Sequence, residues 1–147
     1  MYGIMLFIHL AGLAAWFGVT LMSAFLLLSE KRKLAGGGSA ESAVSTIRIF
    51  NRITHPAAFL VLLSGGIMIM SWSRENMPFW LAFMERVGGM VILLFMIILS
   101  IMGGKLRKKL AAGDRIAASN SIGTYVTSIF VFSLLILAVI FVVSLKF

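Results

Sequence analysis

The chain has no cysteine, and only 12% of its 147 residues are charged. The absence of cysteine excludes disulfide bonds, thiolate metal sites and covalently attached c-type haem. The scarcity of charge comes with 61% hydrophobic residues and a mean hydropathy of +1.06, an apolar content too high for a small water-soluble domain. We therefore expect an integral membrane protein surrounded by a lipid bilayer.

Four apolar runs have few charges and are long enough to cross a membrane. They cover residues 4–28, 55–72, 80–102 and 125–145. About 20 apolar residues in a helix cover the roughly 30 Å hydrocarbon layer. No lysine or arginine precedes the first run, so we expect it to be a retained helix and not a signal peptide. The sequence predicts an all-α fold, a four-helix antiparallel membrane bundle forming a single transmembrane domain over 1–147.

The formal net charge of +8 comes mainly from two segments that flank these runs. The segments 29–54 and 103–124 hold ten of the cations: Lys31, Arg32, Lys33, Arg48, Arg52, Lys105, Arg107, Lys108, Lys109 and Arg115. The middle connection offers only Arg74. By the positive-inside rule, 29–54 and 103–124 are cytoplasmic loops of a multi-pass cell-membrane protein, and both termini are extracytoplasmic. Cations in this arrangement indicate membrane topology and do not indicate nucleic-acid binding.

His9 is the residue that most strongly indicates a function, because polar groups inside a span are costly and often mark sites. Gly12 and Trp16 follow it at spacings of three and seven residues, which places them on the same helix face. An imidazole in an apolar bundle is a good axial ligand for haem iron, with Gly12 leaving room for the flat ring and Trp16 closing over it. One interpretation of the pattern is a haem bound by His9. The alternative is a histidine that is hydrogen-bonded to a neighbouring helix or lies among the headgroups.

His55 is the second histidine, and its depth argues against a shared iron. With a second helix at 55–72, His55 lies near the inner face, about 28 Å of helix rise from His9. Candidates for a sixth ligand in the outer half are Met68, Met70, Met84, Lys146 and the His9 of a second copy in a homodimer.

Three charged residues are expected at the outer level of His9. Glu85 and Arg86 fall in the first turns of the third run, and Arg74 precedes it. Arg86 and Arg74 are candidates for binding haem propionates through charge-assisted hydrogen bonds. Glu85 is a candidate for exchanging protons with a quinol or a porphyrinogen. The alternative is that these side chains extend to the headgroups and only anchor the helix.

The chain resembles the HemJ-type protoporphyrinogen oxidases and the related CopD-like membrane domains. The resemblance is carried by His9, Trp16 and Gly18 in the first run, by 51–60 with the glycines at 65–66 in the second, and by the lysine-containing end 142–147. It implies a b-type haem on His9 and a functionally important Lys146, and Arg86 loosely matches a basic residue of the family's third helix.

These observations predict a membrane redox protein that contains haem b. Its role is electron transfer with a membrane-soluble partner such as a quinone, or oxidation of a tetrapyrrole such as protoporphyrinogen, which would make it an oxidoreductase. One alternative is a CopD-like copper transport protein, which needs methionine or histidine pairs at matching depth that the spacing of the ten methionines does not indicate. Another is a haem-free assembly or scaffold subunit whose small residues are helix contacts.

Overall fold

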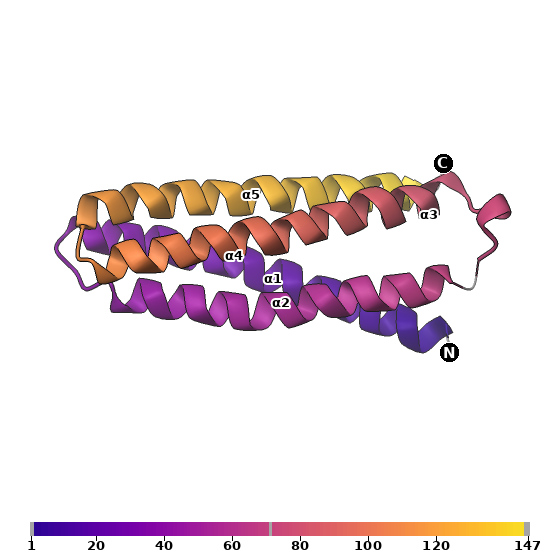
Figure 1. The fold of residues 1–147 in the computed structure, drawn as a ribbon, viewed down its shortest axis with the longest axis horizontal. Coiled ribbons are helices and arrows are strands. Elements are labelled where there is room, and N and C mark those ends of the chain that lie inside the picture. The colour runs from indigo at the N-terminus through magenta and orange to yellow at the C-terminus, as the bar shows by residue number, and fades with distance from the viewer. Residues whose placement is uncertain (1, 71, 146–147) are drawn as a thin grey trace.

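The computed structural model describes residues 2–70 and 72–145, and these residues are almost entirely helical (Figure 1). The elements are α1 (Tyr2–Ala35), α2 (Glu41–Ile69), a 3₁₀ turn η1 (Arg74–Asn76), α3 (Phe79–Phe83), a π-helical turn η2 (Met84–Gly88), α4 (Gly89–Ala111) and α5 (Arg115–Leu145). α3, η2 and α4 follow one another without a break and form one span, Phe79–Ala111. Within the described residues, four helices are therefore long and apolar enough to cross a membrane. This confirms the predicted all-helical membrane architecture.

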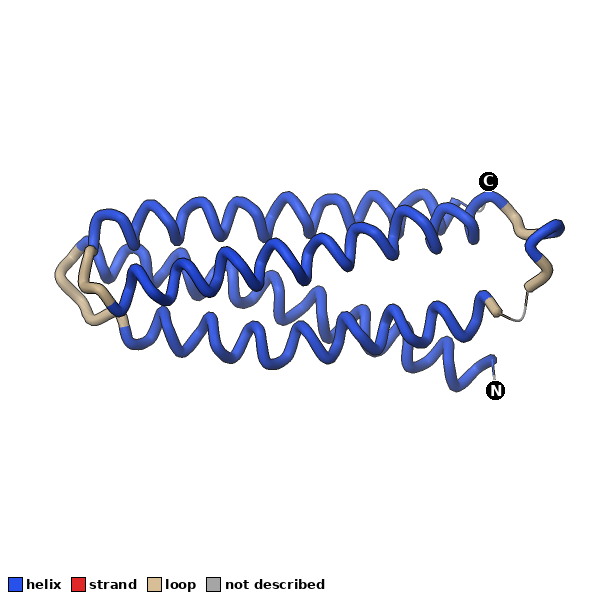
Figure 2. The backbone as a smooth tube through the Cα atoms, viewed as in Figure 1, coloured by secondary structure: helices blue, strands red, loops and turns tan. Residues whose placement is uncertain are grey.

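The four spans form an antiparallel bundle, in which α2 diverges from α3 toward the end that carries the termini (Figure 1). α1 contacts α2 and α5, and α4 contacts the same two helices from the other side. α1 begins and α5 ends at one end of the bundle, which we call the terminal end (Figure 1). The short connections 36–40 and 112–114 lie at the opposite end (Figure 2), which we call the basic end because its helix termini carry the predicted cation clusters.

Each helix extends beyond the apolar run that predicted it. α2 begins at Glu41 and not at 55, α5 begins at Arg115 and not at 125, and α1 continues to Ala35. The predicted loops 29–54 and 103–124 are thus reduced to 36–40 and 112–114. The physical reason is that a helix needs apolar side chains only where lipid surrounds it, whereas its backbone hydrogen bonds continue into the headgroup layer.

The centre of the bundle is filled by aromatic side chains that meet edge to face. Phe95 of α4 is fully buried, and its ring lies 4.8 Å from that of Trp16, 5.7 Å from that of Phe132 and 6.2 Å from that of Phe50. Phe50 in turn lies 6.2 Å from the ring of Tyr125. Such pairs contribute about 0.5–1.5 kcal/mol each beyond the apolar area they bury. They join the four spans in the middle of the bundle, and among them Trp16 also borders the cavity described below.

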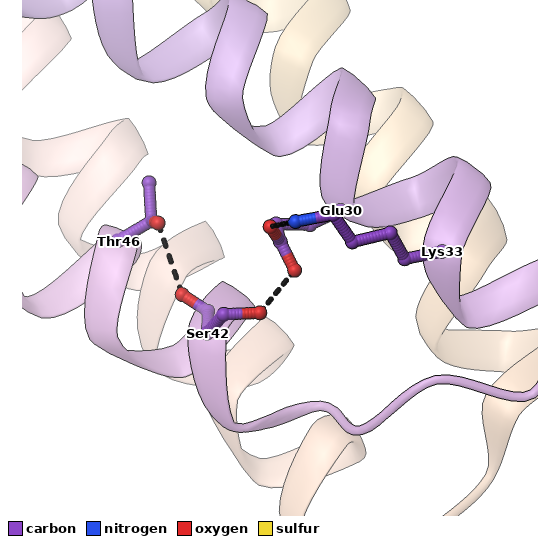
Figure 3. A network of polar contacts seen from close by, with 4 residues as sticks. All are labelled: Glu30, Lys33, Ser42 and Thr46. Carbon is purple, nitrogen blue, oxygen red and sulfur yellow. Dashed lines mark hydrogen bonds and ion pairs between the residues drawn. The ribbon is translucent and has the colours of Figure 1, made fainter.

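A polar clasp joins α1 and α2 at the basic end (Figure 3). The buried carboxylate of Glu30 accepts a hydrogen bond from the Ser42 hydroxyl of α2 and pairs with Lys33 at 2.7 Å. Thr46 donates to the backbone carbonyl of Ser42 at 2.9 Å. The buried Glu30 carboxylate beside the 36–40 connection is therefore both hydrogen-bonded and ion-paired. Its contact with Ser42 holds α1 and α2 in a fixed relative orientation.

Candidate cofactor-binding cavity

A cavity of about 750 Å³ lies among the helices at the terminal end of the bundle. Its volume is within the range of roughly 300–1,000 Å³ that is typical of small-molecule and cofactor sites. The four spans all contribute to its wall, which is mainly apolar and aromatic and also includes His9, Glu85 and Ser144. The bundle therefore provides room for an apolar ligand of cofactor size at the level of His9.

His9 borders this cavity and is oriented from α2. Its Nδ1 lies 3.0 Å from the carbonyl oxygen of Val61 and 3.2 Å from Oγ of Ser64. A carbonyl only accepts, so Nδ1 carries the proton and donates it to Val61. This arrangement leaves the lone pair on Nε2, the atom that an imidazole uses as a metal ligand when its other nitrogen is held in this way. The hydrogen bond to a neighbouring helix, expected as the alternative to a ligand role, is present and leaves Nε2 available.

Gly65 of α2 provides the space in which the imidazole lies. A Cβ at this position would come within 3.2 Å of Cε1 and 3.4 Å of Nδ1 of His9. An alanine at 65 would require the imidazole to shift by a few tenths of an ångström, and a branched side chain would displace it further. Sequence reasoning missed this contact, because a glycine pair in a membrane helix signals close packing without saying what packs against it.

Trp16 and Gly12 occupy different environments although they share a helix face with His9. Trp16 is fully buried, borders the cavity and has an indole N–H without a hydrogen-bond partner among the described residues. Gly12 does not border the cavity. A Cβ there would lie 3.1 Å from Cγ2 of Val61, so its role in the structure is to let α1 and α2 approach each other.

The π-helical turn η2 forms part of the cavity wall and carries Glu85. Such a turn inserts one extra residue into a helix and occurs frequently at functional sites. Here Glu85 and Gly88 border the cavity, whereas Arg86 is exposed on the outside of the span and does not border it. The two neighbouring charges therefore have different surroundings, and the structure brings only Glu85 to the His9 cavity.

Two predicted site residues cannot be placed. Lys146 lies outside the described residues, and of Arg74 only the backbone, in η1, is described. Their roles stay predictions.

Four methionines border the cavity: Met68 of α2, Met70 directly after α2, Met77 of the connection and Met84 of η2. Met68, Met70 and Met84 were expected in this half of the bundle, whereas Met77 was not. Met68 is buried and Met70 is exposed. Met77 could not be predicted because it lies in the connection between α2 and α3, whose course the residue spacing does not define.

His55 lies in the middle of α2 and not at the first residue of its helix, because α2 begins at Glu41 and not at 55. Its Nδ1 donates to the carbonyl of Asn51 at 2.8 Å, and its Nε2 lies 2.5 Å from Oγ of Ser100. Nine residues of α2, about 14 Å of rise, separate it from Ser64, the partner of His9. Both ring nitrogens are engaged, and one iron still cannot bind the two histidines.

No group of three or more histidine, cysteine, aspartate or glutamate side chains suited to a metal ion occurs within 2–70 and 72–145. A metal at this cavity would therefore depend on His9 together with a prosthetic group or with methionines. No protein-family model matches the chain, nor does any curated protein sequence or solved structure.

Proposed function

We propose that the protein binds a b-type haem in the terminal-end cavity through His9 and works as a membrane redox protein. The observation that supports this most directly is the His9 imidazole. Its Nδ1 proton is held by the Val61 carbonyl, and it borders a mainly apolar cavity of about 750 Å³. A prosthetic group that needs one protein nitrogen and a large dry space fits that combination.

At such a haem site, different residues of the chain would have different roles. His9 binds iron through Nε2, and the hydrogen bond from Nδ1 to Val61 increases the donor strength of the ring. Trp16 and its apolar neighbours on the wall keep water away from the ring. Glu85 accepts or releases a proton at its carboxylate when the redox partner needs one. Haem, when bound, supplies one-electron chemistry at a potential set by its ligands and by the dryness of the pocket.

The redox partner that we propose is lipid-soluble, either a quinone or a porphyrinogen. The walls of the cavity are mainly apolar, and the outward faces of the four spans carry many exposed large hydrophobic side chains, so the surroundings are lipid. An apolar partner can reach such a site from the bilayer without crossing water. The resemblance to HemJ-type and CopD-like proteins stays a prediction. It is the reason why a porphyrinogen, which is a tetrapyrrole, is one of the two proposed partners.

The orientation that we propose places the cavity on the extracytoplasmic side of the cell membrane. The basic end carries Lys31, Arg32 and Lys33 on α1 and Lys108 and Lys109 on α4. Clusters of this kind next to a span remain in the cytoplasm. The terminal end, with His9, then faces outward.

An absorption spectrum tests the haem. Protein produced with ample haem should show a Soret band that shifts on reduction and that is lost in His9→Ala, because the iron loses its protein nitrogen. His55→Ala is the matched control, since it removes the other histidine of the chain and should leave the band in place. A colourless wild-type protein, or equal loss of the band in both variants, would overturn the proposal.

The four methionines that border the cavity support a second candidate, Cu(I) binding. Thioethers are soft ligands that select Cu(I), and an imidazole can complete such a site. The two candidates differ in one experiment: a colourless preparation that takes up one Cu(I) per chain, and loses it in Met68→Leu but not in the exposed Met22→Leu, would favour copper handling over haem.

A further inference from the structure

Two lysine side chains from different helices lie against the same turn of α5, in the basic half of the bundle. Lys109 of α4 donates a hydrogen bond to Oγ of Ser121 at 2.8 Å. Lys31 of α1 reaches Gly123, where an added Cβ would lie 3.0 Å from its Nζ. Because Ser121 and Gly123 are two residues apart, the two contacts are separated by only about 3 Å of rise along α5.

The two lysines lie on either side of an exposed polar face of α5. Ile122, between the two contacts, is fully buried and faces the bundle. A helix turns by about 100° per residue, so Ser121 and Gly123 lie on opposite flanks of α5 with its outward face between them. That face carries Asn120 and Thr124, and both are exposed. Two cations and two polar side chains are therefore gathered around one turn of a membrane helix.

The same face of α5 becomes apolar farther into the span. Thr127, Val131 and Leu135 continue it at helical spacing, and all three are exposed. The change from polar to apolar falls near the start of the apolar run 125–145, which is the level expected for the border between lipid headgroups and hydrocarbon. We call the outward face from Asn120 to Leu135 the α5 strip.

The positive charge beside the α5 strip is not neutralised by the carboxylates nearest to it in the sequence. Glu30 is buried in the polar clasp and pairs with Lys33. Asp114, at the start of α5, accepts a hydrogen bond from the backbone amide of Ala117 at 3.0 Å. The lysines that contact α5 form no ion pair within 2–70 and 72–145, so their charge is available to an external anion.

We propose that the α5 strip binds one anionic phospholipid. Its phosphate lies over Asn120 and Thr124 and accepts hydrogen bonds from the two lysines. An ammonium group carries three donors, so Lys109 keeps two beyond its hydrogen bond with Ser121. Gly123 has no side chain, which leaves the amine of Lys31 room beside the helix. Lysines next to a span attract anionic lipids by the same electrostatic interaction.

The apolar half of the α5 strip favours a lipid over a soluble anion. Free phosphate or an acidic segment of a water-soluble protein would contact only the polar turn around Asn120 and Thr124. A phospholipid matches the strip at both levels, because its headgroup lies beside the cations while its acyl chains lie beside Val131 and Leu135.

The test compares two double variants that remove the same charge from the basic end. Lys31→Gln with Lys109→Gln changes the proposed site, and Lys105→Gln with Lys108→Gln changes two exposed lysines of α4. The full-length protein is placed in nanodiscs of phosphatidylcholine, with or without phosphatidylglycerol, and its thermal unfolding midpoint is measured. Phosphatidylglycerol should raise the midpoint of wild type and of the control by the same amount, and that of the site variant by less than half as much. Equal shifts in the two double variants, or no shift in wild type, would overturn the proposal.

Two soluble anions distinguish a lipid from the other sources of the same charge. Inorganic phosphate or polyglutamate, added to wild type in phosphatidylcholine nanodiscs, should leave the midpoint unchanged. A rise with either anion that disappears in the Lys31→Gln, Lys109→Gln variant would assign the two lysines to a water-soluble ligand and reject the lipid.

Discussion

His9 owes its position to a residue with no side chain. The imidazole lies against Gly65, where an added Cβ would come within 3.2 Å of Cε1. The neighbouring Gly66 has no atom within 4 Å of the same position. These two adjacent glycines therefore provide a matched pair for testing whether the placement of His9 matters.

Gly65→Val should weaken or abolish cofactor binding, because its branched side chain displaces the ring and breaks the 3.0 Å hydrogen bond to Val61. Gly66→Val should retain binding. The measurement is the Soret absorbance per protein across a haem titration, and equal binding by the two variants would contradict the proposed role of the imidazole.

For single residues, the sequence predicted that His9 and Trp16 share a helix face, but it did not predict what surrounds them. Their positions on one helix face follow from period and depth alone, and both border the cavity. The contacts with Val61, Ser64 and Gly65 could not be predicted, because they depend on how far α2 is shifted along α1. Gly12 shows the same limit: its place on the His9 face was predicted, but not its contact with Val61.

The π-helical turn is the element that brings Glu85 to the cavity. It adds one residue to the span Phe79–Ala111, so that the part before it is rotated relative to α4. No pattern in the sequence distinguishes 84–88 from an ordinary helix, and the turn was not predicted.

Deleting Val87, an exposed residue of the turn, should restore regular α-helix and rotate Glu85 by about 100° around the axis, away from its present place on the cavity wall. We expect the helical content in circular dichroism to stay unchanged while cofactor affinity falls at least tenfold. Val87→Ala should preserve affinity, and a deletion variant that binds as well as wild type would show that the turn is dispensable.

The polar clasp between α1 and α2 leads to a prediction about how much each of its side chains stabilises the protein. Ser42→Ala leaves the buried Glu30 carboxylate short of a donor and should destabilise the protein by about 1–3 kcal/mol. Lys33→Ala should cost less than about 1 kcal/mol, because the lysine side chain is 62% exposed and solvent screens the pair.

Reversible unfolding in mixed detergent measures the free energy of unfolding of both variants and shows which of them loses more stability. Thr46→Ala is the control, since its hydroxyl bonds only within α2. A larger loss of stability in Lys33→Ala than in Ser42→Ala would mean that the ion pair, and not the hydrogen bond between helices, stabilises this end.

For the whole molecule, the proposed sidedness can be tested directly because the chain has no cysteine. Ser39→Cys reports on the basic end and Ser73→Cys on the terminal end, and both serines are exposed. On intact cells a membrane-impermeant maleimide should label Ser73→Cys, and it should label Ser39→Cys only after permeabilisation. The opposite pattern would reverse the orientation of the cavity.

Helix number and membrane character were predictable from composition and run length, whereas helix length was not. The segments 41–54 and 115–124 are too polar to read as membrane spans, yet they are helical and pack in the basic half through buried residues such as Ile47, Phe50 and Ile122. Hydropathy identifies the part of a helix that lies in lipid, and tertiary packing determines where the helix ends.

The length of the helices has a consequence of its own. α1 has 34 residues and is about 50 Å long, whereas the hydrocarbon layer is only about 30 Å thick. If His9 lies within the hydrocarbon layer near one surface, as proposed, the helix either tilts or extends beyond the other surface. In the second case the helix ends that carry the cations, joined by Glu30 and Ser42, extend out of the lipid as a short rigid projection that water-soluble partners can contact.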